Sequence, residues 1–221
     1  MIKIKKSNEK EGKLIFSTDM TTSLINALRR SALEIPIMAI DEVEIVKNDS
    51  ALYDEIIAHR LGLIPIKTEK GVKETKFKLK EVGPKTVYST DIKPDVETGY
   101  ELPIVLLDNE QELELVAEAR LGKGIEHIKY SPGLIYFKHD IEEEILDFIT
   151  VDDEGKVSFD EEELKHKRLG EDKINRIKKL KSIEDLEVNI ESWGQIKPKD
   201  IFLRAIDALS DNLEELNKEI K

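Results

Sequence analysis

Residues Leu186–Ile220 read LEVNIESWGQIKPKDIFLRAIDALSDNLEELNKEI, and in this stretch the pattern of a strand passes directly into that of a long helix. Leu186, Val188 and Ile190 alternate with polar residues, which predicts a half-buried strand. Pro198 follows near the first position of the helix, where its missing N–H does no harm. A strand joined to a long amphipathic helix favours a fold that mixes helix and sheet.

The predicted helix carries a heptad seam of apolar residues spaced 4, 3, 4, 3 and 4 apart. The seam consists of Phe202, Ile206, Leu209, Leu213, Leu216 and Ile220. Its first half, through Leu209, can equally well pack on the sheet of the same chain. For the second half we expect cover from a partner chain, because leaving a continuous apolar face in water is costly.

The periodicity of the rest of the chain predicts further helices and strands. We expect a hairpin with its turn near residues 8–12, a helix over 20–33, a strand over 37–46, a short helix over 51–61 and mostly strands over 77–138. Thr18 or Asp19 is the expected cap of the first helix, and Ser50 that of the second. The first helix has a small-to-apolar face made of Leu24, Ala27, Leu28, Ser31 and Ile35.

Residues 140–181 are strongly charged and poor in apolar side chains, which predicts an exposed appendage more than a core. Acidic runs at 140–147 and 152–163 precede a basic run at 165–181. The spacing of the acids does not match a calcium-binding EF-hand loop, so we interpret them as solvated. The basic run can touch nucleic acid or pair with the acids before it, and we favour the pairing.

The composition excludes several classes of site. The chain of 221 residues has no cysteine, which excludes disulfides, thiolate metal sites and cysteine-ligated iron–sulfur clusters. Its four histidines are scattered, and no phosphate-binding or nucleophile motif is present. The net charge of −12 opposes nucleic-acid binding by the chain as a whole. Since no apolar stretch suits a membrane span or signal peptide, we expect a cytoplasmic protein.

Three segments together carry a resemblance to a known family. They are Asn26–Ile45 (NALRRSALEIPIMAIDEVEI), His59–Ile66 (HRLGLIPI) and Val188–Pro198 (VNIESWGQIKP). In this order they closely resemble the D-subunit family of archaeal DNA-directed RNA polymerases, the counterpart of the third-largest eukaryotic polymerase subunit and of bacterial α. A fourth stretch, Gly122–Pro132 (GKGIEHIKYSP), is similar to a signature of that family but departs from it at Ile128 and Tyr130.

The resemblance implies an α+β fold in which one domain interrupts the other. A discontinuous dimerisation domain, a sheet backed by helices, is expected to combine residues 1–47 with 183–221. An inserted, mostly β domain is expected over 48–182. Within it, 140–182 would be a reduced, charged remnant of the iron–sulfur domain that many relatives carry, without the cluster because cysteine is absent.

The resemblance also implies partners and site residues. The family pairs with a smaller homologous protein, the L subunit, after which the small N and P subunits and the second-largest subunit join. The expected dimer interface consists of Leu24, Leu28, Phe202, Ile206, Leu209, Leu213, Leu216 and Ile220. Docking to a large subunit is expected at Arg29, Arg30, His59 and Arg60. For Arg29 and Arg30 the alternative is an ordinary solvated charge pair at a helix end, and for His59 and Arg60 it is an acid/base site.

Three aromatic residues are also singled out by position. Trp193 closes a strand, and we interpret it as part of the core. Tyr130 and Tyr136 flank a Pro-Gly turn, where they either dock a small subunit or pack on the sheet.

The function that this resemblance implies is that of an assembly scaffold within DNA-directed RNA polymerase, a nucleotidyltransferase whose active site lies on other subunits. No catalytic, cofactor-binding or metal-binding residue is predicted on this chain. One alternative is a homodimeric subunit of the bacterial α type. A second is a stand-alone nucleic-acid-binding protein that uses the basic run.

Overall fold

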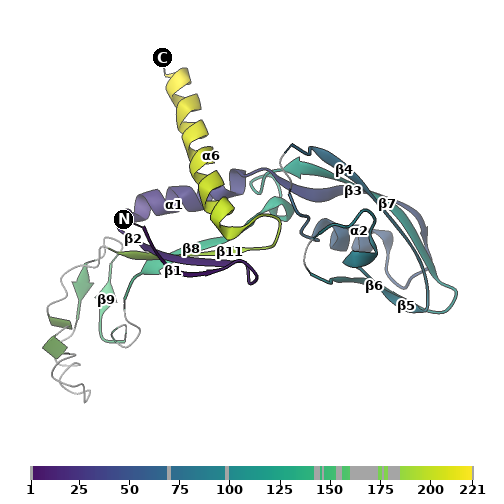
Figure 1. Cartoon of the computed structure of the whole chain (residues 1–221), viewed down its shortest axis with the longest axis horizontal. Coiled ribbons are helices and arrows are strands. Elements are labelled where there is room, and N and C mark those ends of the chain that lie inside the picture. The colour runs from purple at the N-terminus through teal and green to yellow at the C-terminus, as the bar shows by residue number, and fades with distance from the viewer. Residues whose placement is uncertain are drawn as a thin grey trace.

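The computed structural model describes residues 2–68, 71–97, 100–141, 145, 147–152, 156–159, 174–175, 177–178 and 185–220. Two bodies that each combine sheet and helix lie side by side, and one long helix projects away from the first of them (Figure 1). The arrangement confirms the predicted α+β class.

The first body is a four-stranded antiparallel sheet built from both ends of the chain. Its order is β1 (Ile2–Asn8), β2 (Lys13–Thr18), β11 (Leu186–Ser192) and β8 (Gly133–His139). β11 lies between β2 and β8, and its Val188 is fully buried opposite Phe16 and Phe137. The hairpin predicted around residues 8–12 is confirmed.

Two helices pack on this sheet and close its core (Figure 1). They are α1 (Thr22–Ser31), which continues into a 3₁₀ turn at Ala32–Glu34, and α6 (Pro198–Glu219). Ile201 of α6 is fully buried. The rings of Phe16 and Phe202 meet edge to face with centroids 5.0 Å apart, an arrangement that aromatic pairs favour.

Helix α1 differs in detail from its prediction. The Thr21 side chain caps it by accepting a hydrogen bond from the backbone N–H of Leu24, so neither Thr18 nor Asp19 is the cap. The buried face runs through Ile25, Leu28 and Ser31. Leu24, which the periodicity placed on that face, is 43% exposed. The buried face is therefore rotated by one residue, so that Ile25 lies in the core in place of Leu24.

The second body is a three-stranded antiparallel sheet with a hairpin and a helix on one side. The sheet has the order β3 (Ile37–Asn48), β7 (Glu112–Gly122) and β4 (Glu74–Val82). The hairpin pairs β5 (Lys85–Tyr88) with β6 (Pro103–Leu107). Helix α2 (Asp54–Gly62) lies between hairpin and sheet and buries Ile57 and Leu61 completely (Figure 1).

Two local predictions in this body were wrong. The alternation of Thr86–Ile92, within the mostly β stretch predicted over 77–138, suggests a strand through residue 92, but β5 ends at Tyr88. It ends there because the Asp91 carboxylate accepts a hydrogen bond from the Tyr88 N–H and closes a 3₁₀ turn over Ser89–Asp91. The short helix begins at Asp54, so Ser50 does not cap it. Instead, the Ser50 hydroxyl donates to the Asn48 side chain 2.6 Å away and forms the turn before the helix.

Strand β3 joins the two bodies, and the predicted domain limits do not follow the sheets. Ile37 and Ala39 lie in the core of the first body, while Met38 and Ile40 lie in the core of the second. Alternate side chains of one strand point to opposite faces, so both faces here are apolar and each serves a different core. β3 pairs with β7 of the second body, although 37–47 was assigned to the first. β8, assigned to the insertion at 48–182, completes the first sheet.

The charged region contains a small apolar cluster in its described part. Ile145 and Ile177 are buried there against partly buried neighbours, namely Ile141, Phe148, Ile149 and Phe159. A short pairing of β9 (Thr150–Val151) with β10 (Val157–Ser158) accompanies them. The prediction of an exposed appendage more than a core therefore did not include this small cluster. Most of the acidic run at 152–163 and of the basic run at 165–181 lies outside the described residues.

Candidate subunit interface

The second half of α6 projects into solvent as a bare amphipathic helix (Figure 1). Every residue from 210 to 220 is exposed. Leu213, Leu216 and Ile220 are 57%, 52% and 76% exposed, so no part of the described chain covers this half of the seam. An apolar stripe on a helix that is held out in this way is suited to pack against another polypeptide.

The first half of α6 belongs to the chain's own core. Phe202 and Ala205 are buried with Ile201, and Leu209 is partly buried against the same cluster. Ile206, at 36% exposed, marks the transition between the two halves. The heptad seam therefore has two parts. Its first turns hold the helix on the chain's own core, and the side chains of its last turns remain exposed.

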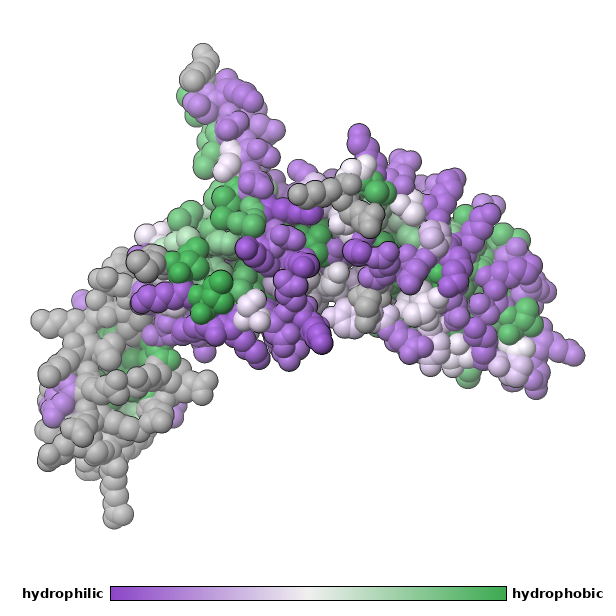
Figure 2. All heavy atoms as spheres, viewed as in Figure 1, coloured by the Kyte–Doolittle hydropathy of each residue, from purple (hydrophilic) through white to green (hydrophobic). Residues whose placement is uncertain are grey.

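The base of α6 and strand β1 enclose an apolar groove of about 290 Å³. Ile2 and Ile4 of β1 and Leu203 of α6 line it and are 46%, 67% and 46% exposed. Phe16 and Phe202 form its floor, with Ile4 directly opposite Phe16 in the strand register. Figure 2 shows apolar residues gathered around the base of the helix. The groove extends the uncovered seam down to the sheet.

The residues predicted for the dimer interface thus divide into two groups. Leu24, Ile206, Leu213, Leu216 and Ile220 offer exposed apolar surface. Leu28 and Phe202 are 4% and 8% exposed inside the chain's own core, and Leu209 is partly buried against it, so these three offer a partner less surface. Sequence reasoning missed Ile2, Ile4 and Leu203, although the alternation of Ile2 and Ile4 with lysines was a signal for an apolar face. The role of these residues in an interface stays a prediction.

The four residues predicted for large-subunit docking lie in two places. Arg29 and Arg30 end α1, and the Arg29 guanidinium donates two hydrogen bonds to the Asn26 side chain, at 2.9 and 3.1 Å. His59 and Arg60 lie in the last turn of α2 and are exposed. Arg60 Nη1 donates to the carbonyl of Ile104 at 2.7 Å, which ties α2 to β6. Arg60 therefore has a role within the fold itself.

A cluster around Asp41 fixes the connection between the two bodies, and no local sequence pattern indicated it. The Asp41 carboxylate on β3 accepts hydrogen bonds from Lys129 and Arg120 and from the Tyr130 hydroxyl, the last at 2.9 Å. Lys129 and Tyr130 belong to the 3₁₀ turn at Ile128–Tyr130 that precedes β8. The cluster thus links the second sheet to the segment that enters the first sheet.

The electrostatics of this cluster follow from its contacts. The hydrogen bond from Lys129, supported by those from Arg120 and Tyr130, holds the pKa of Asp41 well below its usual range despite partial burial. Burial and the hydrogen bond to Asp41 raise the pKa of Tyr130 to about 12. The Tyr130 ring also packs against Gly122, where an added Cβ would come within 2.5 Å of the ring. A glycine is therefore required at position 122.

The three aromatic residues singled out in the sequence have different surroundings. Trp193 is 45% exposed, so its assignment to the core was wrong. It lies just past the end of β11, and its backbone N–H donates to the carbonyl of Pro132 while the side chain faces outward. Tyr130 is buried and packs on the sheet, whereas Tyr136 is 42% exposed on β8.

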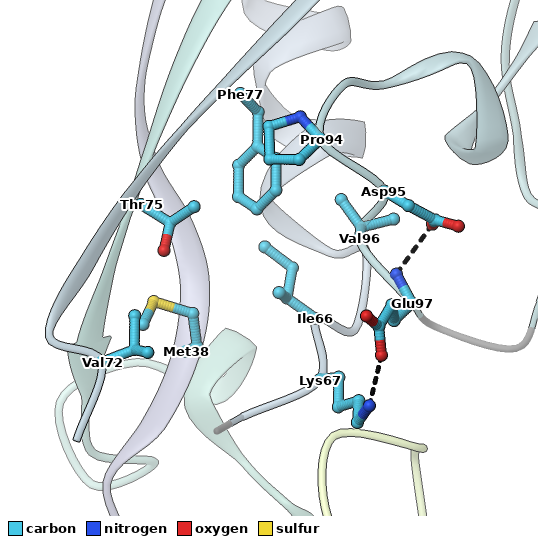
Figure 3. A pocket seen from close by; sticks show the side chains of 10 residues that line it. All are labelled: Met38, Ile66, Lys67, Val72, Thr75, Phe77, Pro94, Asp95, Val96 and Glu97. Atoms are coloured by element: carbon cyan, nitrogen blue, oxygen red, sulfur yellow. Dashed lines mark hydrogen bonds and ion pairs between the residues drawn. The ribbon is translucent and has the colours of Figure 1, made fainter. Parts of the chain in front are cut away.

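A small pocket of about 160 Å³ lies in the second body, between Met38, Ile66 and Phe77 (Figure 3). Lys67 and Glu97 form an ion pair at its edge. Its lining combines apolar side chains with the polar Thr75 and Asp95. No group of three or more His, Asp or Glu that could hold a metal ion occurs in the described part of the chain. No helix there is long and apolar enough to cross a membrane.

Comparison of the sequence with known proteins shows the family to which the chain is related. Residues 15–213 match the model of the RNA polymerase Rpb3/Rpb11 dimerisation domain. The chain is 42% identical to DNA-directed RNA polymerase subunit Rpo3 of Pyrococcus horikoshii over 155 residues, 63% of this chain and 60% of that protein. It thus spans about three-fifths of that relative. The Rpo3 of Methanocaldococcus jannaschii is 38% identical over 67% of this chain and 80% of its own length.

The Rpo3 of Methanothermobacter thermautotrophicus is 30% identical over 89% of this chain and 90% of its own length. The match therefore extends across both bodies and includes the projecting helix up to residue 213. The resemblance inferred from the motifs is confirmed, and the chain belongs to the family of the RNA polymerase Rpb3/Rpb11 dimerisation domain.

Proposed function

We propose that this chain is an assembly scaffold subunit of an archaeal DNA-directed RNA polymerase. The observation that carries the proposal is the uncovered apolar seam of α6, which is continuous with the groove beside β1. A chain of this family that presents the apolar stripe of a bare amphipathic helix is suited to permanent association with another subunit. Its relatives in the comparison are named as polymerase subunits.

The partner we propose for the seam is the smaller homologous L subunit, in a 1:1 heterodimer. Burying half-exposed Leu213 and Leu216 contributes on the order of 1 kcal/mol per side chain. The groove around Ile4 and Leu203 adds further apolar surface. The second-largest subunit and the small N and P subunits would then join this platform, with Arg29, Arg30 and His59 exposed at its surface.

We propose that the chain has no active site of its own and needs no cofactor, while catalysis belongs to other subunits of the polymerase. The absence of cysteine from the sequence leaves no thiolate for an iron–sulfur cluster. The net charge of −12 favours contacts with protein over contacts with nucleic acid. As part of the transcription apparatus, the chain would act in the cytoplasm.

The test is co-expression of the full chain with the L subunit, followed by capture of the pair through a tag on L. Leu213→Asp combined with Leu216→Asp should abolish capture, because each carboxylate would be buried without a partner. Leu106 on β6 is 68% exposed and provides the matched control, so Leu106→Asp should leave capture unchanged. Undiminished capture of the double variant would rule out α6 as the interface.

The same uncovered seam could also serve a second copy of this chain, as in a homodimeric α-type subunit. Sedimentation of the chain alone separates the two possibilities, since a stable homodimer would favour self-association. Salt-sensitive retention of the isolated chain on DNA would favour the stand-alone nucleic-acid-binding protein instead.

A further inference from the structure

The second half of α6, residues 210–219 with Ile220 as the C-cap, is held only weakly by the rest of the molecule (Figure 1). Within the described part of the chain, one side-chain hydrogen bond ties it to another element, from Asn212 Nδ2 to the Glu34 carboxylate at 2.9 Å. Since this bond is exposed, water can replace it at little loss of stability. Tertiary packing supplies most of the stability of helices in proteins, and in α6 the packing ends at Leu209.

The amino acids of this segment also favour a helix only weakly. The first half of α6 contains the strong helix formers Ala205 and Ala208, whereas residues 210–220 contain no alanine. Several residues of the second half have short polar side chains that compete with the helical backbone for hydrogen bonds, namely Ser210, Asp211, Asn212 and Asn217. Local propensity therefore does not replace the missing packing.

The charges of the segment add to this weakness. Asp211 and Glu215 carry like charges four residues apart, as do Glu215 and Glu219, and this spacing brings them together on the helix surface. One pair of opposite sign at the same spacing, Glu214 with Lys218, opposes them. The acids also lie toward the C-terminal end, where the helix dipole disfavours negative charge. Taken together, the local contributions leave this half of the helix close to the balance between helix and coil.

Such a balance matters because the segment carries the exposed part of the seam. An apolar stripe fixed on a rigid exposed helix would associate with other apolar surfaces, including a second copy of the chain. In an open segment Leu213, Leu216 and Ile220 no longer form one face, because that face exists only at helical spacing. A partner that covers the stripe binds the helical form alone and so shifts the equilibrium toward the helix.

We propose that the second half of α6 is mostly open in the free chain and is completed as a helix by its partner. The structure shows the closed form. The first half stays helical throughout, because Ile201, Phe202 and Ala205 anchor it in the core. The identity of the partner rests on the proposed function. The helical fraction then sets the affinity, since the apparent dissociation constant equals the intrinsic constant divided by that fraction.

Amide hydrogen exchange of the full chain, resolved to single residues, tests the opening directly. In the free chain we expect protection factors below about 10 for the amides of residues 214–219, and above about a thousand for those of residues 205–209. Addition of the L subunit should slow exchange at 214–219 more than about a hundredfold. Equal protection of the two segments in the free chain would overturn the proposal.

Alanine and glycine at position 211 test the link to affinity. Asp211 is exposed and lies on the helix face opposite the seam, so the two replacements differ mainly in helix propensity. The difference in propensity corresponds to about a fivefold change in helical population. Because the segment is mostly open, Asp211→Gly should bind the L subunit about fivefold more weakly than Asp211→Ala. A helix that is already closed would keep a fraction near one in both variants, so equal dissociation constants would contradict the proposal.

Asp207 provides the matched control in the first half of α6. It is exposed like Asp211, but Leu209 beyond it packs on the core and keeps this turn helical. Asp207→Gly should unfold at a lower temperature than Asp207→Ala, while the dissociation constants of the two variants for the L subunit should agree within about twofold. A fivefold difference at this position as well would show that glycine acts through the whole fold, and it would overturn the explanation by local opening.

The outcomes also separate this proposal from the proposed function. Weak protection of residues 214–219 in the free chain, together with no binding of the L subunit, supports the opening and contradicts the proposed partner. Binding of the L subunit to a segment that is fully protected beforehand contradicts the opening and leaves the scaffold function intact.

Discussion

Replacing Asp41 by asparagine should destabilise the junction between the two bodies more than neutralising an exposed charged side chain does. Asp41 accepts hydrogen bonds from Lys129, Arg120 and Tyr130, which lie 79 to 89 positions away from it in the sequence. Asparagine keeps the shape of the side chain but loses the negative charge and one acceptor oxygen. The Lys129 ammonium would then be left at a mostly buried position without a counter-charge.

The size of the effect follows from the burial of the partners. The side chains of Asp41 and Lys129 are 18% and 14% exposed, so solvent screens this pair much less than a surface pair. A charge-assisted hydrogen bond in such surroundings contributes roughly 1.5–3 kcal/mol. Arg120 is 54% exposed and adds little. We therefore expect Asp41→Asn to lower the free energy of unfolding by about 2–3 kcal/mol.

The assay is urea unfolding near pH 7, followed by circular dichroism and by the fluorescence of the single tryptophan, Trp193. A double-mutant cycle with Lys129→Met should give a coupling energy of about 1–2 kcal/mol. Glu118→Gln is the control, because the ion pair of Glu118 with Lys76 is half exposed or more on both sides and should contribute less than about 0.5 kcal/mol. A coupling energy near zero, or equal losses in Asp41→Asn and the control, would refute this explanation of the junction.

The cluster also predicts a dependence on pH with a definite sign. The pKa of Asp41 is lowered from its ordinary value of 3.8, so the folded state binds its proton less readily than the unfolded state. The ionised Asp41 carboxylate therefore stabilises the fold fully above pH 3.8. This stabilisation is lost as the pH falls further toward the pKa of Asp41 in the folded state. The difference in stability between wild type and Asp41→Asn should shrink as the pH is lowered below 3.8. A constant difference down to about pH 2 would contradict this assignment.

Three further substitutions have defined outcomes. Ile201→Ala should lower the free energy of unfolding by about 2–4 kcal/mol in urea denaturation, because Ile201 is completely buried; a loss below about 1 kcal/mol would contradict its place in the core. Gly122→Ala should lower the free energy of unfolding by about 1–3 kcal/mol in the same measurement, since the new methyl group meets the Tyr130 ring. A neutral effect would show that the ring can move aside. Leu216→Asp should change the stability of the isolated chain by less than about 0.5 kcal/mol, because Leu216 is exposed in it, and a large loss would mean that the helix is covered by its own chain.

The sequence predicted the elements whose signals are local. The alternation in Leu186–Ser192 and the heptad in Phe202–Ile220 each depend on residues a few positions apart, so strand β11 and helix α6 followed directly. Pro198 marked the start of the helix for the same reason. The uncovered half of the seam was also predictable, because it continues an apolar pattern among charged residues.

The features that could not be predicted from the sequence depend on contacts between residues that lie far apart along the chain. Asp41 meets its three donors only because β3 and β7 pair and bring residues 79 to 89 positions away within hydrogen-bonding distance. No local pattern marks that meeting point. Likewise, the apolar run that begins β3 predicted a buried strand. It did not show that alternate side chains of this strand enter two different cores, because that depends on where each body packs. Trp193 was misjudged because its neighbours in sequence do not show that the chain leaves the sheet there.

The most direct test of the central claim is the mass in solution of the full chain, measured by sedimentation equilibrium with and without the L subunit. Because the chain of 25.3 kDa exposes the seam of α6, we expect a stable 1:1 heterodimer with L that Leu213→Asp combined with Leu216→Asp converts back to separate chains. A chain that sediments at its own mass in the presence of excess L, or a pair that the double variant leaves intact, would contradict the claim that this helix is the assembly interface.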